Sequence, residues 1–160
     1  MNGFVSSPAT VPALPDEAVL KHDASFSPGV KPSSVRTAAR IPSQVIETRL
    51  RDAIVTAMLT VSTELATWRA AKELEGFATL AAVSPDDTIG GRPRLVVLYE
   101  RAIASFTAAE LADTHRDISA SADGQKRAED EALTADEHRR NGTHAIRDIL
   151  GMTRTSVELI

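Results

Sequence analysis

The sequence predicts an all-α fold: a small helical bundle with an extended, proline-rich N-terminal arm and a strand-like C-terminal tail. Apolar residues recur at helical spacing through residues 41–151, whereas six of the eight prolines lie in the first 42 residues. Aromatic residues make up only 4% of the 160 residues, which suits closely packed helices around one thin core. We therefore divide the chain into an arm (1–40), a helical domain (41–151) and a tail (152–160).

The arm carries serine, threonine and alanine between its prolines. Such a segment buries too little apolar surface to offset the entropy that it loses on ordering. Its four basic and three acidic residues nearly cancel. We therefore predict that residues 1–40 are extended.

The first helix is predicted over residues 43–74. Pro42 and Ser43 form a start signal, and Glu73 with Gly76 marks the end. Trp68 shares the apolar stripe of this helix, so we place it in the core. The other members of the stripe are Ile46, Leu50, Ile54, Val61 and Leu65.

A second helix is predicted from residue 93 to about residue 115. Before it, "SPDD" (84–87) fits a capped turn with proline at the first helical position, and "TIGGRPR" fits a tight connection. The apolar positions of this helix are Leu95, Leu98, Ala102, Ile103, Phe106 and Leu111.

The stretch "DISASADGQKRAED", residues 117–130, is predicted to join two helices. Asp123 and Gly124 supply a turn, and Asp123 also caps the helix that follows. A phosphate-binding loop would need a run of glycines or a facing basic site, and this stretch has neither.

A third helix is predicted over residues 126–140. Asn141 and Gly142 should break it, since glycine costs about 1 kcal/mol relative to alanine in a helix interior. Thr143 then caps a short final helix that ends at Gly151.

The last residues alternate like a strand but have no partner strand in this chain. Val157 and Leu159 share one face of the pattern. Because an isolated strand is unstable, the tail either frays or adds to the sheet edge of a partner. Burial of the two side chains would contribute roughly 1.5–3 kcal/mol each before ordering costs. The candidate partner-binding residues are Thr155, Ser156, Val157, Glu158, Leu159 and Ile160.

The composition disfavours several classes of protein. A net charge of -4 and a pI near 5.6 argue against a protein that grips nucleic acid through its phosphates. The absence of cysteine excludes disulfides and thiolate sites. The start has neither the basic nor the apolar region of a signal peptide, and the longest apolar run, "LVVLY", is far short of a membrane span of roughly 20 residues. We expect a soluble protein, made inside the cell, with no membrane contact.

No residue pattern predicts catalysis, a metal or a cofactor. The histidines at positions 22, 115, 138 and 144 lack the i+3 or i+4 spacing of helical metal ligands. "IGGR" lacks the Gly-Lys-Ser/Thr of a phosphate loop. The adjacent acids at 86–87 and 130–131 do not face one site on a helix. We therefore predict that the protein is not an enzyme.

From about Pro42 to its end, the chain resembles the phage head completion proteins, the L-type capsid-completion family of temperate contractile-tailed phages. The first predicted helix, followed by Gly76, Phe77 and Leu80, is similar to the family's first helix and its Gly-Phe-x-x-Leu turn. "PDD" with "IGG" matches its acidic turn, "YERA" (99–102) a step of its second helix, and "DISASADGQKRAED" its Asp-x-Ser-Ala…Gly-x-Lys stretch. "HRRNGTHAIRD" departs from the family's last helix, because it has an Asn-Gly step and no aromatic residue, and the arm does not match in detail.

The resemblance implies a structural head-to-tail connector, or adaptor, with no known chemistry. Such proteins form a ring, usually twelvefold, below the portal, where they extend the DNA channel, help to retain packaged DNA and provide the platform for neck and tail attachment. The implied partners are the portal protein, neighbouring copies of the chain, a downstream neck or tail-completion protein, and packaged DNA that passes without sequence-specific binding. The implied location is the head-tail neck of the virion, after synthesis in the host bacterial cytoplasm.

Three finer expectations follow for this chain. The tail should dock on the portal by strand addition, and the arm should wrap a neighbour in the ring. Residues 41–160 hold 19 of the 22 acidic but only 14 of the 18 basic residues. This excess suggests an acidic channel wall, past which DNA would slide.

The alternative is a nucleic-acid-binding helical module, such as a small packaging or regulatory protein. It would need a recognition helix with several basic residues on one face. The best candidates are Arg139, Arg140 and Arg147, and Gly142 interrupts them.

Overall fold

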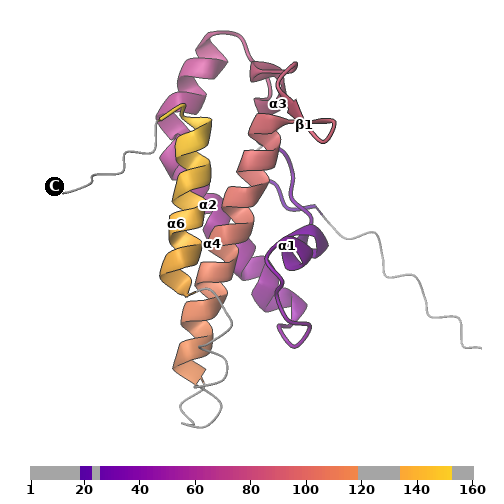
Figure 1. Cartoon of the computed structure of the whole chain (residues 1–160), viewed down its shortest axis with the longest axis vertical. Helices are drawn as coiled ribbons and strands as arrows, with labels where there is room; N and C mark the ends of the chain where they lie inside the picture. Colours follow the sequence, from indigo (N-terminus) through magenta and orange to yellow (C-terminus); the bar gives the residue numbers. More distant parts are fainter. Residues whose placement is uncertain (1–18, 23–25, 119–133, 153–160) are drawn as a thin grey trace, which may run out of the picture.

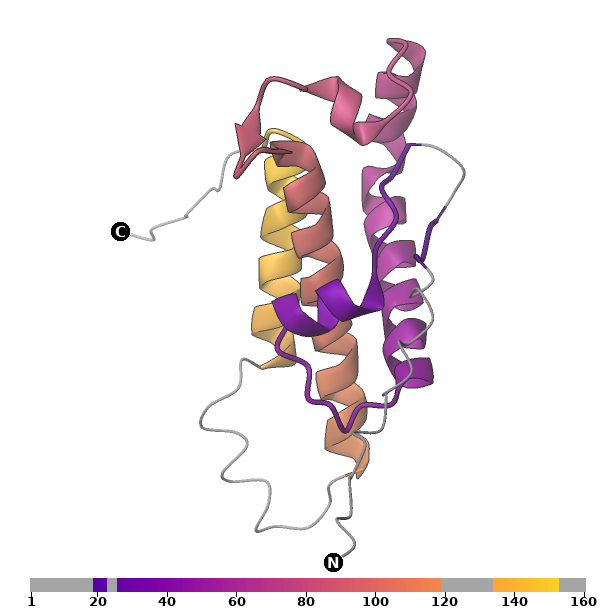
Figure 2. The ribbon, with the colours of Figure 1, turned by 90° about the vertical axis from the view of Figure 1, so that its right-hand side faces the viewer.

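Over the residues that the structure describes, the protein is a bundle of three long helices. The structure is a computed structural model that describes residues 19–22, 26–118 and 134–152. Helix α4 (Arg94–Ile118) packs along α6 (Ala135–Ile149) on one side and α2 (Glu47–Leu74) on the other. In Figure 1 α6 lies beside α4 and α2 runs behind them, and Figure 2 shows α6 and α2 on opposite sides of α4. The predicted all-α bundle is confirmed.

The core lies mainly between α2 and α4. On α2 one stripe is buried, at positions three or four residues apart. It faces a buried stripe on α4, and Trp68 is half-buried against the same cluster. The buried members are Leu50, Ala53, Ile54, Ala57, Met58, Val61 and Leu65 on α2, with Leu95, Leu98, Tyr99, Ala102 and Ile103 on α4.

Helix α2 begins at Glu47, four residues after the predicted start, and ends at Leu74 as predicted. Before it, the Arg36 guanidinium donates hydrogen bonds to the carbonyls of Pro42 (2.8 Å) and Val45 (2.9 Å), and this holds the chain in a turn. Gly76, with a φ of 95°, closes the other end in the left-handed conformation that favours glycine.

A short connection leads from α2 to α4. Helix α3 (Leu80–Val83) is capped by the Thr79 side chain, and the Asp87 N–H donates to the Ser84 carbonyl after it. The predicted turn at 84–87 is therefore present, but no helix begins at its proline. Strands β1 (Thr88–Ile89) and β2 (Arg92–Pro93) then pair in a two-residue hairpin. Gly90 and Gly91 both have positive φ, which this tight turn requires and which confirms the predicted tight connection.

The prediction of an extended arm is wrong for residues 26–40. Phe26, Val30 and Val35 are each 3% exposed and belong to the core cluster. Val30 pairs with Leu20 in an isolated bridge, and α1 (Pro32–Ala38) packs on α2 and α4. Pro32 lies in the first turn of α1, where its missing N–H has no helical partner to lose.

The predicted break at Asn141 and Gly142 is also wrong, because α6 runs unbroken through both residues. A Cβ on Gly142 would lie 2.6 Å from Phe106 Cε2, so the missing side chain lets α6 approach α4 closely. Thr134, not Thr143, caps the helix, while Gly151 ends it as predicted, with a φ of 70°.

Several predictions lie outside the described residues: the arm before residue 19, the join at 119–133 and the tail from residue 153. The division of the chain into arm, helical domain and tail stays a prediction for those residues. Over the described ranges, none of the helices is both long and apolar enough to cross a membrane.

Candidate interaction surfaces

A groove of about 900 Å³ lies between α1, α4 and α6, and we call it the α1–α4–α6 groove. Its apolar lining includes Val30 and Val35 from the N-terminal segment and Val97 and Ala104 from α4. No residue of α2 lines it. Two of its three walls exist only because residues 30–40 fold onto α4 and Gly142 brings α6 close.

The groove carries more positive than negative charge. Lys31, Arg40 and Arg101 line it and are exposed, and within the described part of the chain none of the three forms an ion pair. Glu100, its one carboxylate, is already engaged by Arg92. That hydrogen bond and the carboxylate charge raise the pKa of Arg92. A cationic patch with an apolar floor is therefore open in a chain whose net charge is -4.

Arg40 stands in a conformation that L residues rarely adopt. Its φ is 52°, and the N–H of Ile41 after it donates to the Arg36 carbonyl at 2.9 Å, which closes α1. The turn that holds Arg40 at the groove is thus kept at some backbone cost.

The outward side of α2 is a second uncovered surface. We call Asp52, Val55, Thr56, Leu59, Thr63, Ala66 and Ala70 the outer face of α2; all seven are exposed. Val55 is 46% and Leu59 56% exposed, and no charge interrupts the face between Asp52 and Ala70. Because side chains three or four residues apart share a side of a helix, these residues form one continuous strip.

The hydroxyl groups on this strip are already satisfied within the helix. Thr56 donates to the Asp52 carbonyl at 3.2 Å, and Thr63 to that of Leu59 at 2.9 Å. Because both hydroxyls already donate within the helix, covering them with another surface leaves no donor unsatisfied. Burial of the outer face of α2 against another surface therefore carries a small desolvation penalty.

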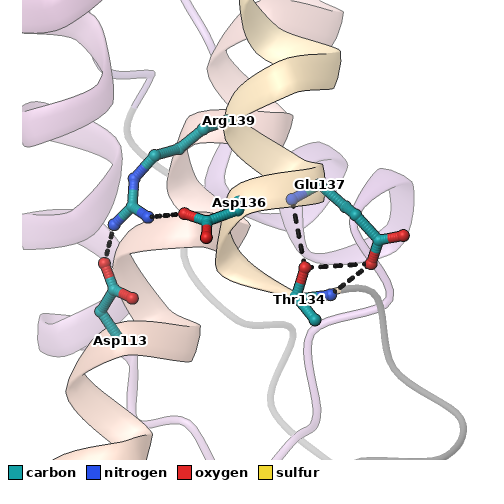
Figure 3. Close-up of polar contacts among 5 residues, drawn as sticks. All are labelled: Asp113, Thr134, Asp136, Glu137 and Arg139. Atoms are coloured by element: carbon teal, nitrogen blue, oxygen red, sulfur yellow. Dashed lines mark hydrogen bonds and ion pairs between the residues drawn. The ribbon is translucent and has the colours of Figure 1, made fainter.

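A polar junction at the start of α6 fixes this helix on α4 (Figure 3). The Thr134 side chain accepts from the Glu137 N–H, and the Glu137 carboxylate accepts from the Thr134 N–H at 2.8 Å, which forms a capping box. These hydrogen bonds lower the pKa of Glu137. Arg139 reaches both Asp136 on its own helix and Asp113 on α4.

The three arginines of the alternative nucleic-acid reading do not form a free basic face. Arg139 is paired with two carboxylates, and Arg147 is half-buried. The described residues also contain no group of three or more His, Cys, Asp or Glu side chains that could hold a metal ion. His138 lines the groove, and burial lowers its pKa despite the nearby Glu137 carboxylate.

The sequence analysis missed both surfaces. Two of the groove's three cations lie in the segment assigned to the arm, although Phe26, Val30 and Val35 gave an apolar signal there. The exposed Val55 and Leu59 were hidden among the many apolar residues of α2. The predicted site, residues 155–160, lies outside the described residues.

Comparison with known proteins identifies a family for this chain. The family model described as phage head completion protein (GPL) matches residues 22–160. The chain is 37% identical over 145 residues, which are 91% of this chain and 85% of the relative, to the head completion/stabilization protein of Escherichia phage P2. No solved structure matches the chain significantly. The family match over residues 22–160 and the 37% identity over 91% of the chain show that this chain belongs to the phage head completion protein family.

Proposed function

We propose that this protein is a head-to-tail connector of the virion. Copies of the chain form a ring, twelvefold in the simplest case, below the portal. The ring extends the DNA channel, helps to retain the packaged genome and carries the neck protein that binds next. The observation that carries this proposal is the family match over residues 22–160, together with a relative named for head completion and stabilization.

The shape of the chain supports a role in assembly rather than chemistry. Two surfaces of the described fold are left uncovered, the α1–α4–α6 groove and the outer face of α2, and both suit protein contacts. A ring subunit needs at least two such surfaces, because each copy touches a neighbour on either side.

The tail is proposed to dock on the portal by strand addition. Helix α6 ends at the end of the bundle where α4 begins, and Gly151 and Met152 are exposed there (Figure 1). In strand addition, main-chain hydrogen bonds provide affinity and alternate side chains fill pockets.

Co-sedimentation with portal rings from the same genome tests the proposal. Full-length protein should bind stoichiometrically, and a chain that lacks residues 155–160 should not. A variant with Val157→Asp and Leu159→Asp, which alters one face of the tail, should also fail. The matched control, Ser156→Ala with Glu158→Ala, alters the opposite face and should bind.

Each outcome has a distinct meaning. Binding by the truncated chain would place the portal contact on the helices and remove the strand-addition step. Failure of the full-length chain to bind intact portal would overturn the connector assignment. A gel shift of DNA at low salt would then favour the nucleic-acid-binding alternative.

A further inference from the structure

The two uncovered surfaces lie on different sides of the molecule. Figure 2 shows α2 on one side and α6 with α4 on the other, while α1 crosses in front. The groove is lined by α1, α4 and α6, and the outer face of α2 points away from α4, because the opposite stripe of α2 is buried. One copy can therefore use both surfaces at once with two different neighbours.

The surfaces also complement each other in chemistry. The outer face of α2 offers Val55 and Leu59 as projecting apolar groups, and the groove offers an apolar floor that includes Val97. Asp52, at one end of the face, forms no ion pair within the described residues, and Arg101 at the groove rim forms none either. Pairing these charges would satisfy both and fix the register of the contact.

We infer that the outer face of α2 of one copy docks into the α1–α4–α6 groove of the next copy. This assignment rests on the proposed ring and names the contact that builds it. A contact between two different patches of the same chain is heterologous, and repeated contacts of this kind close into a ring when the rotation per copy divides a full turn. The cationic, apolar-floored groove favours a partner surface that is apolar and carries an acid. The outer face of α2 on a second copy of the chain has both properties.

The contact accounts for a feature that the isolated fold leaves without a role. Val55 and Leu59 are large apolar side chains that are exposed at the middle of a long helix. Such exposure is expected of a surface that is covered after assembly.

Engineered cysteines test this contact, and the chain has no cysteine of its own to interfere. Val55→Cys places a thiol on the outer face of α2, and Ala38→Cys places one at the groove; both positions are exposed. Phage particles assembled with the double variant should give a ladder of crosslinked species on oxidation. Particles assembled with a mixture of the two single variants should give a dimer only.

The controls separate this contact from other arrangements. Val55→Cys paired with Ala78→Cys, an exposed residue outside both surfaces, should give no ladder. Crosslinking of Val55→Cys to itself would show that two α2 faces meet symmetrically and would overturn the inference. A second pair, Leu59→Cys with Ser34→Cys, an exposed residue of the groove, guards against loss of folding in the first pair.

Immunoblotting of the same particles distinguishes the two proposals. Absence of the wild-type chain from mature heads would overturn the connector proposal itself. Presence of the double variants in heads, without a ladder from either pair, would overturn only the docking assignment.

A charge exchange provides an independent readout. Asp52→Arg or Arg101→Glu alone should reduce the ladder several-fold, since each places like charges together. Both changes in one chain should restore it, because the pair is re-formed with opposite sign. Failure of the double exchange to restore the ladder would contradict the pairing of these two residues.

Discussion

Helix α4 is packed in two different ways on its two sides. Towards α2 the contact is built from large side chains, and Leu50, Ile54 and Val61 are completely buried there. Towards α6 small residues stand beside Ile146 and Ile149, and Gly142 lies against the ring of Phe106. The first contact gains stability from buried apolar area, whereas the second depends on how closely two backbones approach.

The difference explains how an alanine-rich chain with few aromatics forms a stable bundle. On the α2 side, the N-terminal segment adds area: Phe26 packs edge-on against Trp68, with ring centroids 6.2 Å apart, and the Arg69 guanidinium lies over its ring. On the α6 side no such cover exists among the described residues. The α2 side should therefore tolerate small changes in side-chain volume better. On the α6 side, a substitution that adds atoms at Gly142 should not be tolerated.

The largest expected effect comes from removing the cover on the α2 side. Phe26→Ala deletes a ring that is 3% exposed and should lower the free energy of unfolding by about 3–5 kcal/mol. Urea unfolding measures this loss. Leu74→Ala, at a residue of α2 that is 91% exposed, is the control and should change stability by less than about 0.5 kcal/mol. Equal, small effects of both changes would mean that residues 26–40 behave as the extended arm that the sequence predicted.

An intermediate effect is expected on the α6 side, with a sign that helix propensity alone would not predict. In a helix interior, Gly→Ala normally stabilises by about 1 kcal/mol. Gly142→Ala should instead destabilise by about 1–3 kcal/mol, because the new Cβ would lie within 3 Å of three atoms of the Phe106 ring.

A double-mutant cycle isolates that contact. In a Phe106→Ala background the clash is absent, so Gly142→Ala should become stabilising by up to about 1 kcal/mol. If Gly142→Ala destabilised both backgrounds equally, close approach to Phe106 would not be the reason for glycine at this position.

The smallest expected effect is a dependence on pH at His138. Burial lowers the pKa of this side chain below 6.5, so the unfolded chain takes up the proton first and stability falls as the pH drops below about 6.5. The lowered pKa of Glu137 acts in a separate range, because its contribution is lost only as the pH falls below about 4.5. Unfolding at pH 7.5 and 5.5 should therefore show a small loss that His138→Gln reduces. An unchanged loss in His138→Gln would assign the dependence to other groups.

The predictions that held depend on local patterns. Helix α2 was placed by its apolar period, and its end at Leu74 by a glycine that takes a positive φ. The hairpin at Gly90 and Gly91 was likewise visible as a tight connection. In each case the neighbours in the sequence are also the neighbours in space that set the conformation.

The predictions that failed depend on residues far away in the chain. The sequence predicted an extended arm over residues 26–40, because the few apolar side chains there contact residues that are distant in the sequence, on α2, α3 and α4. The groove was invisible because its walls come from three segments.

By itself, the sequence determined the helical class, the extents of α2 and α4 to within a few residues, the glycine-ended helices and the absence of disulfides. Only the tertiary structure decided that one glycine continues a helix while others end one, since Gly76 and Gly151 face open space and Gly142 faces an aromatic ring. Tertiary packing also decided which apolar and charged residues were left exposed. The physical reason is that backbone propensity acts over a few residues, whereas burial is settled by contacts between segments that the sequence keeps apart.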